Sequence, residues 1–142
     1  MVEFAIVLLV FLGMLMAIFE GARLAMTAWV ISTAARDGAR AGIYLPSSAL
    51  PVATIDTRIK TRVQATATRL GITVPNANII ICRHASADAL VTDACDTAAP
   101  PLTSASVVDV TVTYTFSFVP FAGDWLSQGN QTLTGYYRAG IE

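Results

Sequence analysis

The chain opens with the stretch MVEFAIVLLVFLGMLMAIFEGARLAMTAWVISTAARDGARAG, residues 1–42, which predicts a single long helix. The stretch contains no proline, and its expected end is Gly42, followed by the helix breaker Pro46. At 1.5 Å per residue, such a helix would be roughly 60 Å long. A chain of 142 residues cannot bury a helix of that length in one domain, so part of the helix must project.

The two halves of this helix suit different surroundings. Phe4 to Phe19 is a run of sixteen residues without a polar side chain. It spans about 24 Å, short of the roughly 30 Å of a bilayer's hydrocarbon layer unless the flanks contribute. Because the run is apolar all round, it must contact lipid or other protein. The following apolar residues narrow to a stripe that can lie against a globular head, made of Leu24, Ala28, Ile31, Ala35 and Ala39.

We therefore predict two parts in the chain. Residues 1–22 form the hydrophobic half of the helix, which belongs to a membrane or to the core of a filament. Residues 23–142 form the amphipathic half together with an α+β globular head, and about 100 residues after the helix are enough for one small core.

Glu3 is the unusual residue of the first helical turn. A carboxylate just before an apolar run is the opposite of a secretory signal peptide, which begins with positive charge. Burial of an unpaired carboxylate is expensive, so Glu3 should be paired, protonated or held at a membrane surface. The simpler alternative is an interfacial carboxylate stabilised by the helix N-terminus by about 0.3–1 kcal/mol. Residue type alone leaves both interpretations open.

Glu20 and Arg23 are three residues apart and can pair on the helix surface. The pair could simply mark the end of apolar packing at the water interface. Alternatively, it could lie between neighbouring helices, where burial would demand good pairing. The second interpretation is favoured because Gly21 and Ala22, and also Gly13, permit close approach of another helix.

After the turn-rich stretch of residues 43–52, a second helix is expected from about Ala53 to Leu70. Thr54 is its candidate N-cap, and Gly71 ends it. Its apolar residues fall on one face at spacings of four and three: Ile55, Ile59, Val63, Ala67 and Leu70.

Three strands are expected in the rest of the chain. Residues 78–83, NIIICR, predict a short buried strand, and residues 84–106 a surface loop. Val107 to Phe118 alternates apolar side chains with Asp109, threonines and a serine, which predicts a strand with one core face and one wet face. After a loop or short helix, residues 131–138 predict the last strand. The head is thus an α+β domain with a second helix and a small antiparallel sheet of three or more strands.

Composition narrows the function. Hydrophobic residues make up 54% of the chain and charged residues 13%, well below the roughly 25% of an ordinary soluble domain, so external partners must cover much apolar surface. A net charge of −1 lacks the basic footprint of a nucleic-acid-binding protein. No nucleophile elbow, phosphate loop or paired-carboxylate motif is present, and the single histidine, His84, is expected at the surface. We expect neither catalysis nor a cofactor.

The N-terminal segment resembles the TadE-like pseudopilins of tight-adherence (Tad) pilus systems, which are related to type IV pilins. The residues that carry the resemblance are the VEFA opening at residues 2–5, Phe19 and Glu20 with Arg23, and the AARDGAR segment at residues 34–40. The resemblance is strong over residues 2–42 and extends to the order of elements in the rest. The family's glutamate is usually fifth in the mature chain, whereas here it is third, so we expect this chain to begin two residues inside the mature protein.

The resemblance implies a pilin-like fold and an assembly function. Members are made with a basic leader, held in the inner membrane, cut by a prepilin peptidase and assembled by the pilus machinery. The implied function is a structural subunit that polymerises through its N-terminal helix into an extracellular filament for surface attachment, with Glu3 neutralising the N-terminal amine of a neighbour. The candidate assembly residues are Glu3, Phe4, Leu8, Phe11, Gly13, Leu15, Phe19, Glu20 and Arg23.

Other functions remain open at this point. TadE-like proteins usually act as minor pseudopilins that support assembly without forming the fibre. A membrane-anchored binding module that never polymerises, or an integral component of a secretion machine, would carry the same helix.

Two cysteines bracket part of the predicted loop. In an exported head, Cys82 and Cys95 are expected to form a disulfide, worth roughly 3 kcal/mol in the chain-entropy model. The alternative is a metal site with His84, but two cysteines and one histidine fall short of four structural ligands. One of three aspartates would have to complete it: Asp88, Asp93 or Asp96. We therefore expect no metal.

Overall fold

The computed structural model describes residues 2–43, 51–84, 107–118 and 130–140. Its elements are α1 (Val2–Ile43), α2 (Val52–Arg69), the short 3-10 helix η1 (Asn76–Asn78) and the strands β1 (Ile79–His84), β2 (Val107–Phe116) and β3 (Gln131–Gly140). The strands form one antiparallel sheet in the order β1-β2-β3. The predicted α+β layout, with a long first helix, a second helix and a small sheet, is confirmed.

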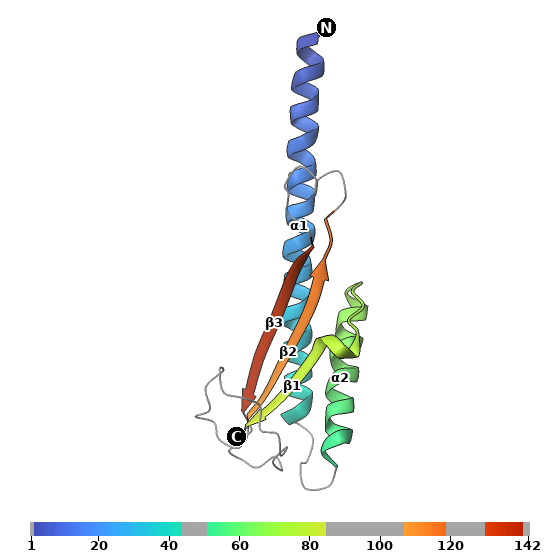
Figure 1. The fold of residues 1–142 in the computed structure, drawn as a ribbon, viewed down its shortest axis with the longest axis vertical. Helices are drawn as coiled ribbons and strands as arrows, with labels where there is room; N and C mark the ends of the chain where they lie inside the picture. The colour runs from blue at the N-terminus through green and yellow to red at the C-terminus, as the bar shows by residue number, and fades with distance from the viewer. Residues whose placement is uncertain (1, 44–50, 85–106, 119–129, 141–142) are drawn as a thin grey trace.

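Helix α1 runs through the molecule without a break. Figure 1 shows its first half projecting beyond the head, while its second half lies behind β2 and β3 with α2 beside it. The predicted end at Gly42 is confirmed to within one residue, since the helix ends at Ile43.

The buried stripe of α1 is rotated from the predicted one. Ile31, Ala35 and Ala39 are buried as expected, but Ala28 is exposed and Leu24 only half-buried. Two neighbours explain the difference, because the sheet and α2 both pack on α1 and widen its buried face. The residues that the sequence pattern missed are Val30, Ala34, Gly38 and Gly42.

The second helix carries the predicted apolar face. Four of its five residues are buried, namely Ile55, Ile59, Val63 and Ala67, and Leu70 is half-buried. The predicted cap was wrong: Pro51 is the N-cap and makes no side-chain hydrogen bond, while Thr54 lies within the first turn. Proline can precede a helix because its fixed φ and missing N–H cost nothing there.

Gly71 ends α2 as predicted, with a left-handed φ of +85°. The Ile72 N–H donates to the Ala67 carbonyl (2.9 Å) and the Gly71 N–H to the Thr68 carbonyl (3.0 Å). These two bonds form a Schellman motif, which satisfies the last carbonyls of the helix and turns the chain toward β1.

The strands differ from their predicted bounds by one or two residues. Strand β1 begins and ends one residue later than expected, β2 ends at Phe116 rather than Phe118, and β3 continues to Gly140. The predicted alternation holds on the inner face of β2, where Val108, Val110 and Val112 are fully buried.

Gly135 lets β3 approach α1 closely. A Cβ at this position would lie 2.7 Å from Ile31 Cγ2 and 2.8 Å from its carbonyl carbon and oxygen. Only glycine fits where backbone meets backbone at such distances. The sheet therefore lies directly against the helix at this point, and the core is formed between them.

The outer face of β2 is not uniformly wet. Thr111 and Thr113 are half-buried and Thr115 is exposed, but Asp109 is only 4% exposed. The pattern predicted a wet Asp109, and that prediction was wrong because the register places Arg138 of β3 directly opposite it.

Candidate assembly site

The projecting half of α1 presents large apolar side chains all round. Twelve of them between Phe4 and Phe19 are exposed by 44% to 74%. They include five of the predicted assembly residues: Phe4, Leu8, Phe11, Leu15 and Phe19. In the part of the chain that the structure describes, α1 is the one helix long and apolar enough to cross a membrane.

Glu3 and Gly13 also lie on this projecting half. Glu3 is exposed in the first turn of α1, where a carboxylate interacts favourably with the helix dipole. Gly13 has open space around it, because a Cβ there would meet nothing within 4 Å. Packing among the described residues therefore does not require glycine at this position.

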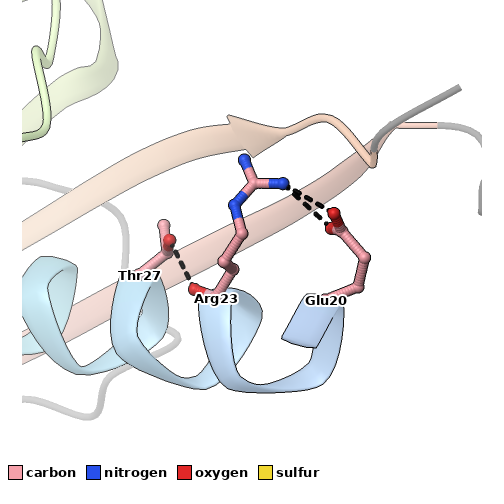
Figure 2. Close-up of polar contacts among 3 residues, drawn as sticks. All are labelled: Glu20, Arg23 and Thr27. Carbon is pink, nitrogen blue, oxygen red and sulfur yellow. Dashed lines mark hydrogen bonds and ion pairs between the residues drawn. The ribbon is translucent and has the colours of Figure 1, made fainter. Parts of the chain in front are cut away.

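Glu20 and Arg23 form the predicted pair at the junction between the projecting half and the head. Arg23 Nη1 donates to both carboxylate oxygens of Glu20, at 2.8 and 3.0 Å (Figure 2). The Glu20 side chain is 2% exposed and that of Arg23 is 41% exposed. One turn further on, Thr27 Oγ1 donates to the Arg23 carbonyl at 2.8 Å. The carboxylate is thus buried within a single chain.

Arg23 also contacts the sheet. Its guanidinium lies over the ring of Phe116 at 5.3 Å from the centroid, at the end of β2. Phe118 meets the same ring edge-on, with the two centroids 5.1 Å apart and the planes at 83°. A cation over an aromatic face is attracted by the ring quadrupole. The pair therefore links α1 to β2 at the level where the helix leaves the head.

Phe116 is the functional contact that sequence reasoning missed. The strand alternation placed Phe116 on the core face, but nothing in the sequence indicates which turn of α1 it meets. The turn of α1 that Phe116 meets depends on how far along the helix β2 lies in the folded chain, and that position is set by tertiary packing.

A second polar cluster joins the three strands. Arg138 of β3 donates to Asp109 of β2 through Nε (2.7 Å to Oδ1) and Nη2 (2.6 Å to Oδ2). His84 Nε2 of β1 lies 3.4 Å from Asp109 Oδ2, and the His84 side chain is 4% exposed. The expectation that His84 lies at the surface was therefore wrong. The residue is packed against a carboxylate because the register brings the end of β1 beside Asp109.

This cluster also involves Tyr136. Burial raises the pKa of the Tyr136 phenol above its ordinary 10.0, with a smaller contribution from its hydrogen bond to Asp109. The hydrogen bonds to Asp109 raise the pKa of Arg138 further above its ordinary value. The arrangement holds the three strands together by charge-assisted hydrogen bonds.

The predicted disulfide stays a prediction. Cys82 lies in β1, half-buried, whereas Cys95 lies outside the described residues. The aspartates of the alternative metal site, residues 88, 93 and 96, also lie outside them. Within residues 2–43, 51–84, 107–118 and 130–140, no group of three or more His, Cys, Asp or Glu side chains could hold a metal ion.

Comparison with known families gives one match. The model of the TadE-like protein family matches residues 1–40, which comprise nearly all of α1. No curated protein and no solved structure significantly matches the chain. The family match confirms the resemblance of the N-terminal segment. Together with the apolar helix, it supports a membrane-anchored component of a Tad pilus system.

Proposed function

We propose that this chain, a TadE-like protein through residues 1–40, is a structural subunit that polymerises through α1 into an extracellular filament used for surface attachment. The observation that carries the proposal is the projecting half of α1, whose apolar side chains from Phe4 to Phe19 are exposed while the head has its own core. The precursor resides in the inner membrane, and its partners are a prepilin peptidase, the pilus assembly machinery and further copies of itself.

The exposed half of α1 can exchange contacts with lipid for contacts with other copies of the chain. In the membrane its side chains contact lipid, and in the filament they contact the same half of neighbouring copies. Because lipid tails are as apolar as leucine, the hydrophobic effect does not favour either state strongly. Packing between helices drives the exchange, and open positions such as Gly13 allow the helices to approach closely.

Glu3 sets the register of this assembly. By the resemblance to pilins, its carboxylate pairs with the N-terminal amine of an adjacent subunit. Such a pair in a low dielectric fixes register more than it adds stability. In this proposal the chain catalyses no reaction. The heads, on the outside of the filament, make the contacts with the surface to which the filament attaches.

A second function follows from the resemblance to TadE-like pseudopilins. By that resemblance, which implies a minor pseudopilin, the chain could instead prime a fibre built by another protein or belong to the membrane-bound assembly machinery. Both functions use the same anchored helix and differ in the abundance of this chain in the filament.

Electron cryomicroscopy of detergent-free material sheared from the cell surface separates the two. Filaments whose map fits this chain throughout, with residues 4–19 bundled at the axis, would establish the fibre subunit. Filaments built from another protein, with this chain absent or confined to a tip, would establish the minor role.

Substitution of Glu3 tests its register role. We expect Glu3→Ala to lower the yield of sheared filaments at least tenfold at an unchanged amount of membrane-bound protein. Glu3→Asp, which keeps the charge, should retain more assembly than Glu3→Ala. Assembly of Glu3→Ala at the wild-type yield would refute the role of this carboxylate.

A further inference from the structure

Helix α1 carries an uncovered apolar surface alongside the head as well as beyond it. We call this the outer patch and define it as Ala22, Ala25, Met26 and Trp29, all exposed, with Met26 at 59% and Trp29 at 60%. The outer patch continues a face of the projecting half. Ala25 follows Phe11 and Ile18 at intervals of seven residues, which places them within one helix face.

No charge interrupts this face. Between Glu3 and Arg36, the only charged residues of α1 are Glu20 and Arg23. Both side chains point to the side of the sheet in Figure 2, where they pair with each other. The opposite side of the helix is therefore free of charge from the first turn to the level of Trp29 and beyond.

Lipid does not reach the far end of the outer patch, at Met26 and Trp29, when the helix spans a membrane. The head begins at the level of Arg23, where Phe116 contacts it, and the residues beside Phe116 at this end of the sheet are polar and exposed: Thr115, Ser117, Asn130 and Thr132. These polar residues keep the hydrocarbon layer from extending past about Glu20. Trp29 lies nine residues further, roughly 13 Å along the helix, whereas the headgroup layer on each side is only about 5–8 Å thick.

We propose that the outer patch binds the Phe4–Phe19 half of a second copy of this chain, a proposal that rests on the polymerisation proposed above. Helices in contact lie about 8–10 Å apart, and a head that adds a second helix and three strands to α1 is wider than that. Because the outer patch lies opposite the sheet (Figure 2), two copies whose heads face the same way cannot sit at one level, and such copies must be offset along the helix axis.

The offset determines what meets the outer patch. When the second copy is displaced toward the head by ten residues, roughly 15 Å, its Phe19 comes level with Trp29 of the first copy. The apolar side chains of the Phe4–Phe19 half of the second copy then pack on the outer patch of the first copy, and both surfaces become buried. Gly21 lies beside this patch, and a Cβ there would meet nothing within 4 Å in the described part of the chain, so packing among these residues does not account for this glycine. A second helix that approaches this side of α1 closely accounts for the glycine.

Photo-crosslinking tests the contact directly. With p-benzoylphenylalanine in place of Trp29, irradiation of sheared filaments should give a covalent dimer of the chain. Its crosslink should map to the tryptic peptide that ends at Arg23, which contains residues 4–19 of the second copy. The same probe in place of the exposed Thr115, on the outer face of the sheet, should not crosslink to that peptide.

Substitution supplies a second measurement. Trp29→Asp should lower the filament yield at least tenfold at an unchanged level in the membrane, whereas Trp29→Phe should change it less than threefold. Filaments of Trp29→Asp at wild-type yield, with no crosslink from position 29, would overturn the outer patch as an interface while leaving polymerisation intact. A wild-type chain that forms no filaments would overturn both proposals.

A lipid contact would be recognised separately. The chain has two tryptophans, so Trp125→Phe leaves Trp29 as the single tryptophan, whose indole fluorescence can be excited apart from that of the tyrosines. In vesicles of brominated phosphatidylcholine, this fluorescence should be quenched by less than a fifth. Strong quenching by acyl-chain bromine would show that lipid covers Trp29 and would overturn the proposal.

Discussion

At Gly38, α1 and α2 approach so closely that no side chain fits between them. A Cβ at Gly38 would collide with Val63 Cγ2, a branched side chain held in the core. We expect Gly38→Ala to lower the free energy of unfolding by about 1–3 kcal/mol, the usual cost of overpacking. Denaturant unfolding of the detergent-solubilised chain, followed by circular dichroism, measures this change.

Gly21 provides the matched control on the same helix. Since a Cβ there meets nothing within 4 Å, Gly21→Ala should leave the chain at least as stable, and helix propensity favours alanine by up to about 1 kcal/mol. Equal stability of the two alanine variants would contradict the close packing of α1 on α2.

Tyr136 makes the stability of the head fall in alkaline solution. Its pKa in the folded chain is raised above 10.0, first by burial and then by Asp109, so the unfolded chain loses this proton at lower pH than the folded chain does. Its contribution is fully present below pH 10 and is lost as the pH rises through the folded pKa. We expect the free energy of unfolding of Tyr136→Phe to decline less steeply than that of the unchanged chain as the pH rises above 10. Parallel curves for the two chains, measured by thermal unfolding, would contradict this assignment.

At the scale of elements, the link between α1 and β2 depends on Glu20 and Arg23. Arg23→Leu leaves a buried carboxylate without its partner and should cost about 1.5–3 kcal/mol, the worth of hydrogen bonds to a charged group. The double change Glu20→Leu with Arg23→Leu should cost less than the sum of the two single changes, because no orphaned charge remains. A double-mutant cycle measures the coupling, and strictly additive costs would refute a buried pair.

The elements themselves could be read from the sequence because their signals are local. Alternation identified β2 from Val107, and a glycine followed by a proline identified the ends of both helices. The face of α1 was harder to predict, because among many alanines the phase of the stripe depends on what packs there. Ala28 fits the 3.6-residue period and is nevertheless exposed.

The contacts between elements could not be predicted from local signals. Asp109 and His84 were interpreted as surface residues because the sequence pattern does not contain the register of β1 on β2 or of β2 on β3. Arg23 and Glu20 were correctly paired because they are three residues apart on one helix, whereas Phe116, at the end of a strand ninety-three residues away from Arg23, was not found.

At the scale of the whole molecule, the chain has two parts that meet near Glu20: the projecting half of α1, which needs an apolar environment, and the head, which has its own core. Among the described residues, every buried one lies at or after Glu20, and the core is formed by α1, α2 and the sheet. The projecting half therefore contributes nothing to the packing of the head among the residues that the structure describes. This division explains how a chain with 54% hydrophobic residues can have a small, well-packed core.

A chain that begins at Glu20 tests this division. Residues 20–142 keep the Glu20–Arg23 pair, the contact with Phe116 and the whole described core. We expect this variant to be monomeric without detergent, as measured by light scattering after size exclusion. Its free energy of unfolding should lie within about 1 kcal/mol of that of the full chain in detergent, because the deletion touches no packed group. Starting the chain at Val30 instead removes the pair and should lower the stability further, because Phe116 then loses its cation. If residues 20–142 aggregate or unfold, the projecting half stabilises the head, and the filament core and the head are not independent parts of this molecule.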